Sequence, residues 1–225
     1  MILPTITPCV VHGQEFLVVA TANGVEINGT KIYNIFDDKM LLKGYQQKYT
    51  NLSKEILLEM IKDSTLTPYK SAAAVRVFKE NYSGEVVSKE KKNIEKMLLR
   101  RLDRTDSAFV QVEIMHTLCR LDRYRYFKSM MPALIQKLDH YNETINEMAF
   151  TALNDIIASG YNRPREARTV FNTLRKVLFL SRKRLADITE PGPKLVQKLT
   201  LLRWSIKVLG NQELKKLPKE VINLL

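Results

Sequence analysis

A short apolar and basic segment occurs twice in the chain, and this repeat constrains the fold more than any other feature. Leu98–Asp103 reads LLRRLD, and 36 residues later Leu134–Asp139 reads LIQKLD. Each copy is followed, after a short polar turn, by a second amphipathic stretch. A unit of roughly 35 to 40 residues made of two helices cannot bury its apolar face alone, so copies stack side by side. The repeat therefore predicts an array of antiparallel helix pairs.

The second stretches match each other at an offset of 35. Val110, Ile114, Met115, Leu118 and Leu121 correspond to Ile145, Ala149, Phe150, Leu153 and Ile156. A weaker copy precedes them, in which Ile56–Ile61 ends a helix and Ala74, Val75 and Phe78 take the places of Ile114, Met115 and Leu118. The spacings of 3, 4 and 7 are helical. Unrelated amphipathic helices that happen to align are the alternative.

Prolines and glycines divide the second part of the chain into helices. A missing amide proton costs least at a helix start, where we expect Pro68, Pro132, Pro164, Pro193 and Pro218. Just past helix ends we expect Gly84, Gly160 and Gly210. The predicted helices span residues 53–62, 68–81, 91–103, 108–121, 129–140, 143–159, 164–188, 193–209 and 212–224.

The first 44 residues differ from the rest and hold half of the eight glycines. Short β-prone runs cover residues 15–22, 25–27 and 30–35, and Asn23-Gly24 and Asn28-Gly29 suit hairpin turns. Two or three such strands are not stable alone in water. We therefore expect a small β-meander over residues 1–44 as an appendage to a helical-repeat domain over residues 45–225.

The net charge of +12 is concentrated in the last third of the chain. Residues 160–225 carry fifteen basic and five acidic groups, whereas residues 1–87 carry nine of each. This distribution predicts an acidic partner for the C-terminal half, and nucleic acid is the commonest such partner.

The predicted helix 164–188 separates an apolar face from a basic one. Arg165, Arg168, Arg175, Lys176, Arg182 and Lys183 share one arc of the helical wheel. Cations distributed over a helix of about 35 Å could follow a phosphate backbone, although a solvated basic face is the alternative. Phe179 falls in the same arc, where it stacks on a base or packs beneath the next helix.

Two further clusters combine cations with aromatic rings. Residues 120–128 include Arg123 and Arg125 beside Tyr126 and Phe127, a combination that suits single-stranded nucleic acid, or packing at the start of the next helix. Helix 193–209 carries Trp204 between Arg203 and Lys207, as a stacking platform or as part of the core.

Candidate catalytic motifs are few. The sequence contains no Gly-rich phosphate loop, Gly-x-Ser-x-Gly, His-Glu-x-x-His or Cys-x-x-Cys. His116 shares a helix face with Glu113 and Cys119, and we expect it to be buried rather than a metal ligand. Cys9 and Cys119 indicate no disulfide framework. We expect no catalytic residue, no metal, no cofactor and no small-molecule substrate. No apolar run is long enough to cross a membrane, so we expect no membrane partner and an intracellular location, cytoplasmic or nucleoid/nuclear.

The matched segments in residues 53–159, and by extension 164–209, resemble the HEAT-like and armadillo-like helical repeats. This resemblance implies a right-handed α-solenoid whose concave face holds a peptide, a protein or a nucleic acid. One branch, the alkylpurine DNA glycosylases, is similar in size and basicity and uses a carboxylate with aromatic residues. No Asp here can be matched with Trp204, and Asp155 and Asp187 are merely available acids.

The sequence thus predicts an all-α protein, a right-handed α-solenoid of antiparallel helix pairs with a small N-terminal β-meander. Its predicted function is non-enzymatic binding of a polyanion, DNA or RNA, through a basic C-terminal ridge with little base reading. A protein-scaffold adaptor that meets an acidic protein surface is the second hypothesis, and a HEAT-like DNA glycosylase is the third.

Overall fold

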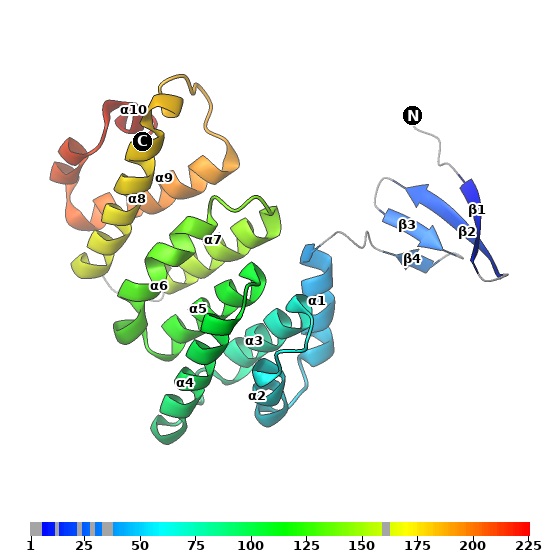
Figure 1. The fold of residues 1–225 in the computed structure, drawn as a ribbon. Helices are drawn as coiled ribbons and strands as arrows, with labels where there is room; N and C mark the ends of the chain where they lie inside the picture. The colour runs from blue at the N-terminus through cyan, green and yellow to red at the C-terminus, as the bar shows by residue number, and fades with distance from the viewer. Residues whose placement is uncertain (1–5, 12–13, 22–23, 28–29, 33–37, 159–162) are drawn as a thin grey trace.

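The structure, a computed structural model, describes residues 6–11, 14–21, 24–27, 30–32, 38–158 and 163–225 (Figure 1). From residue 38 onward the regular elements of the described residues are all helical. No described helix combines the length and the apolar character that a membrane span needs.

The N-terminal elements are four short strands in an antiparallel sheet of order β1-β2-β3-β4. Their bounds are β1 Ile6–Val11, β2 Gln14–Thr21, β3 Gly24–Ile27 and β4 Thr30–Ile32. Pairings such as Cys9 with Phe16 and Val25 with Ile32 fix the register. The predicted turn residues Asn23, Asn28 and Gly29 lie outside the described residues.

Helices account for the rest of the described chain. Their bounds are α1 Asp38–Tyr49, α2 Lys54–Lys62, α3 Pro68–Tyr82, α4 Ser88–Arg104, α5 Ala108–Leu121, α6 Arg123–Lys137, α7 Glu143–Ala158, α8 Pro164–Leu185, α9 Pro193–Leu209, the 3-10 helix η1 Asn211–Lys216 and α10 Lys219–Ile222. Seven of the nine predicted helices therefore have an observed helix within a few residues of the predicted ends.

The packing contacts between the helices arrange α1 to α8 in two rows. α1, α3, α5 and α7 pack successively on one another and form the odd row. α2, α4, α6 and α8 form the even row, in which each of the first three packs on the odd-row helix that follows it in the chain (Figure 1). α9 packs on α8, and η1 and α10 complete that end. Helices next but one in the chain thus lie side by side in the odd row.

The matched repeat positions form the centre of the core. Leu118 and Leu153 are fully buried, as are Ile114, Ala149 and Phe78. The apolar positions on α8, among them Phe171 and Leu174, extend the same core toward the C-terminus. The 3.6-residue periodicity therefore identified the buried face correctly.

The helix α6 starts earlier than residue 129, the start that the sequence predicts. It begins at Arg123 because the side chain of Asp122 accepts a hydrogen bond from the backbone N–H of Arg125 and caps the helix. Pro132 lies inside α6, not at its start. The carbonyl of Lys128, which has no helical partner because of this proline, belongs to an exposed residue where water can satisfy it.

Both ends of the helical region also differ from expectation. α1 begins at Asp38, so residue 44, the predicted boundary, falls within a helix. Gly44, a residue that disfavours helix, hid it in the sequence, although Leu42 is fully buried. At the other end, Pro218 separates η1 from α10, whereas the sequence predicts a single helix over 212–224.

Candidate functional site

The predicted basic ridge lies on α8, and most of its cations are available to a ligand. Arg165, Lys176 and Lys183 are exposed, and Arg175 is half-buried. None of these four forms an ion pair within the described part of the chain. Arg182 stacks over the Phe179 ring, with 4.2 Å between the guanidinium carbon and the ring centroid. We call Arg165, Arg175, Lys176, Arg182 and Lys183 the α8 ridge.

Arg168 shares the wheel arc of the ridge but is already neutralised. Its guanidinium lies 2.7 Å from the carboxylate of Glu213, which is only 3% exposed and also contacts Lys216. Hydrogen bonds from Arg168 and Lys216 lower the pKa of Glu213. This contact joins α8 to η1, so Arg168 connects two elements instead of facing a partner.

The predicted cations of α9 divide in the same way. Arg203 donates to the backbone carbonyls of Leu224 and Leu225 and so holds the C-terminal residues, while Lys207 is exposed. Trp204 is half-buried and packs against the core. The interpretation of Trp204 as a core residue is therefore the better one.

Arg123 and Arg125 both contact carboxylates. Arg123 on α6 forms an ion pair of 2.5 Å with Glu166 on α8, and these side chains are 13% and 12% exposed. Arg125 contacts Glu95 of α4 at 3.0 Å, and the hydroxyl of Tyr126 donates to the same carboxylate. Tyr126 and Phe127 are buried, so this segment packs consecutive even-row helices together.

A polar groove that the sequence did not reveal lies across the odd row. It has a volume of about 370 Å³ and is lined by residues of α1, α3, α5 and α7. Its cations are Lys39, Arg76, Lys79 and Arg120, and its carboxylates are Glu80, Glu113, Glu147 and Asp155. The equal numbers of each sign make the groove a charge-compensated surface, unlike the α8 ridge.

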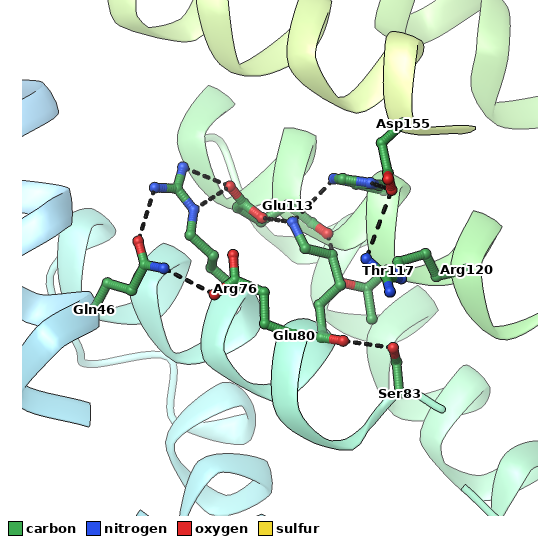
Figure 2. A network of polar contacts seen from close by, with 10 residues as sticks. Gln46, Arg76, Glu80, Ser83, Glu113, Thr117, Arg120 and Asp155 are labelled. Atoms are coloured by element: carbon green, nitrogen blue, oxygen red, sulfur yellow. Dashed lines mark hydrogen bonds and ion pairs between the residues drawn. The ribbon is translucent and has the colours of Figure 1, made fainter. Parts of the chain in front are cut away.

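The groove side chains form one chain of polar contacts (Figure 2). Arg76 and Lys79 of α3 both contact the Glu113 carboxylate of α5, at 2.7 and 2.8 Å. Lys79 Nζ also lies 2.9 Å from His116 Nδ1, and His116 Nε2 lies 2.7 Å from Asp155 Oδ2 on α7. Because the Lys79 ammonium can only donate, Nδ1 accepts and Nε2 carries the imidazole proton.

These contacts shift the titration of the groove residues. Burial and the adjacent Lys79 lower the pKa of His116 to about 4. Burial raises the pKa of Glu113, but Lys79 and Arg76 outweigh it and bring it to about 2. Near neutral pH, His116 is therefore neutral and Glu113 is ionised. Burial raises the pKa of the Cys119 thiol to about 12, which keeps it protonated.

Several groove residues occupy positions that the sequence alignment of α3, α5 and α7 matches with one another. At the offsets of 40 and 35 that align the buried residues, Arg76 corresponds to His116 and Thr151. By the same offsets, Glu80 corresponds to Arg120 and Asp155. All six line the groove. The repeat alignment carried this signal, but the side chains differ at each position, so no motif marked them.

Among the described residues, no group of three or more His, Cys, Asp and Glu side chains is arranged to hold a metal ion. Asp155 lines the groove, whereas Trp204 does not. No family model matches the chain, and neither a curated protein nor a solved structure is similar to it.

Proposed function

We propose that this protein is a non-enzymatic interaction module that binds a polyanion, in the first place the backbone of a nucleic acid, through the α8 ridge. The proposed architecture is a right-handed α-solenoid with the β-meander as its N-terminal appendage. The packing of α1, α3, α5 and α7 as one row and of the even helices as another supports a solenoid.

The observation that carries the proposal is the contrast between the two rows. α2, α4, α6 and α8 contain twenty basic and six acidic residues. α1, α3, α5 and α7 contain seven basic and six acidic residues. An excess of positive charge on one row attracts an extended anionic partner, and cations without an ion pair contribute to that attraction without first breaking an internal contact.

The state of the groove supports a role in binding without catalysis. Its buried carboxylate Glu113 is ionised and held by two cations, and His116 is fixed in one tautomer by Lys79 and Asp155. A general base needs a pKa near the working pH, and the pKa of His116, about 4, is well below that range.

The test is a fluorescence anisotropy titration of labelled DNA and RNA, single-stranded and duplex, over a range of salt concentrations. Replacing Arg165, Lys176 and Lys183 together by Gln should reduce the slope of log affinity against log salt by about 3 on duplex DNA, at about 0.9 for each phosphate contact removed. Affinities for different sequences should fall about equally, because phosphate contacts carry no sequence information. Lys43→Gln with Lys48→Gln on α1 is the control, since both lysines are exposed and lie off the even row.

Binding of a protein partner in the groove is the second candidate. Repeat arrays present matching positions of successive units to their partners, and Arg76, His116 and Thr151 form such a set. Thr151→Arg would place a long cation at an exposed position in the groove. If a protein partner binds in the groove, this variant loses that partner in a pull-down, and the wild type binds neither DNA nor RNA even at low salt.

A further inference from the structure

A second basic surface lies on α4, far in sequence from the ridge on α8. Lys92, Lys96, Arg100 and Arg104 follow one another at intervals of four residues, and all four are exposed. Residues four apart lie on the same face of a helix, so this stripe extends over about 18 Å. We call these four residues the α4 stripe.

The α4 stripe borders a hollow between the end of α2 and α4. The hollow has a volume of about 500 Å³ and is lined by Lys62, Ser64, Asn93, Lys96, Met97, Arg100, Arg101 and Arg104. Five of these residues are cationic and none is acidic. The groove of the odd row is similar in size, but there each cation is matched by a carboxylate.

The cations around this hollow have few partners of their own. Within the described residues, Lys96, Arg100 and Arg104 form no ion pair, while Lys62 contacts Glu59 at 2.5 Å. Arg101 donates through one terminal nitrogen to Ser71 Oγ at 3.3 Å, and its Nε is buried without a hydrogen-bond partner. The carboxylate of Asp63, next to Lys62, accepts hydrogen bonds from Thr65 and also interacts electrostatically with Arg101.

A cluster of cations that repel one another is stabilised by an anion with several acceptor oxygens. Arginine pairs with phosphate through two parallel hydrogen bonds, and Ser64 and Asn93 supply further donors at the same hollow. We propose that this hollow is a phosphate-binding site and that it takes phosphates of a nucleic-acid backbone.

The inference rests on the proposed function and extends its surface. α4 and α8 belong to the same row, with α6 between them joined to α4 by Arg125 and Glu95 and to α8 by Arg123 and Glu166. Adjacent packed helices lie about 8 to 10 Å apart, so a nucleic acid that contacts both surfaces crosses about 20 Å of the even row. The proposed nucleic-acid interface then extends from α4 to α8 and is not confined to the C-terminal ridge.

The test compares two variants matched in charge, Lys96→Gln with Arg100→Gln and Arg104→Gln on α4, and Arg165→Gln with Lys176→Gln and Lys183→Gln on α8. All six side chains are exposed, so circular dichroism should show the wild-type helix content in both. Each variant removes three phosphate-binding cations. Between about 50 and 200 mM salt, the affinity of the α4 variant for duplex DNA should therefore fall about 40-fold less than that of the wild type.

A second measurement probes the hollow without nucleic acid. Pyrophosphate should raise the thermal midpoint of the wild type and of the α8 variant above that in chloride of equal ionic strength, and it should not raise that of the α4 variant. The inference is overturned if only the α8 variant loses DNA binding, while the α4 variant keeps the wild-type DNA affinity and the wild-type pyrophosphate shift of the thermal midpoint. The proposed function would remain intact in that case. If the wild type binds no nucleic acid, the proposed function fails. In that case, a pyrophosphate effect that depends on the α4 residues would support a phosphate-binding site that does not bind nucleic acid. The absence of a pyrophosphate effect would contradict the phosphate-binding site too.

Discussion

His116 on α5 donates through Nε2 to Asp155 Oδ2 on α7, at 2.7 Å, while its other ring nitrogen accepts from Lys79 on α3. One imidazole thus joins three successive helices of the odd row. Because the residue is buried, at 6% exposure, and faces the Lys79 ammonium, its protonation inside the fold is unfavourable. Acid therefore destabilises the fold around the groove through the protonation of His116, and this effect requires no bound ligand.

The first prediction concerns this pH dependence. The pKa of His116 falls from 6.5 in the unfolded chain to about 4 in the fold, so the unfolded state binds the proton first as the pH drops. The free energy of unfolding should therefore be fully retained above about pH 6.5 and decrease by about 3 kcal/mol at most toward pH 4. The lowered pKa of Glu113, about 2, adds a further loss between about pH 4.5 and 2.

Urea unfolding measured at a series of pH values would check this. His116→Gln should flatten the dependence between about pH 4 and 6.5, since Gln does not titrate, and should leave the loss below pH 4.5. An unchanged dependence in the variant would show that another group is responsible.

The second prediction concerns the buried pair of Arg123 and Glu166. Glu166→Ala removes the carboxylate that forms a buried ion pair with Arg123, whose side chain is 13% exposed, and the free energy of unfolding should fall by about 3 to 5 kcal/mol. Arg163 contacts the same carboxylate but is 42% exposed, so Arg163→Gln should cost about 1 kcal/mol or less. Chemical denaturation of both variants tests the difference, and equal losses would contradict it.

The third prediction concerns the repeat core. Leu118→Ala and Leu153→Ala remove matched, fully buried side chains and should each reduce the free energy of unfolding by about 2 to 5 kcal/mol. Tyr124 is 90% exposed, and Tyr124→Ala is the control, with an expected change within about 0.5 kcal/mol. Guanidinium unfolding gives all three values.

The fourth prediction places the start of the helical region. Removing residues 1–37 should leave the thermal midpoint of helix unfolding unchanged, because α1 remains complete. Removing residues 1–44 also deletes Leu42, which is 1% exposed, and should lower that midpoint. Circular dichroism melts of the two truncated chains distinguish a boundary at 38 from one at 44.

The fifth prediction concerns Arg168. Arg168→Gln removes the contact with Glu213 that joins α8 to η1, so backbone amides in residues 211–222 should exchange faster with solvent. Arg165→Gln, on the same helix but without an ion pair in the described structure, should leave that exchange unchanged. Hydrogen exchange followed by mass spectrometry gives both results. Equal protection of the amides of residues 211–222 in the two variants would contradict a structural role of Arg168.

The sequence alone determined the helices and their buried faces. The apolar spacing that marked Leu118 and Leu153 is local, because a helix repeats every 3.6 residues whatever it packs against. The same locality identified the cations of α8. Where a local signal was misleading the prediction was wrong, as at α1, where Gly44 masked a helix, and at α6, where Pro132 suggested a start that lies inside the helix.

Only the tertiary structure decided which charges are free. Arg168 is neutralised by Glu213, 45 residues away, and Arg123 by Glu166, 43 residues away, whereas Arg165 has no such partner in the described residues. The groove around His116 likewise requires Lys79 and Asp155, from the helices on either side. Coulomb attraction and desolvation depend on distance in space, and the packing of the helices sets those distances, so periodicity along the chain cannot predict them.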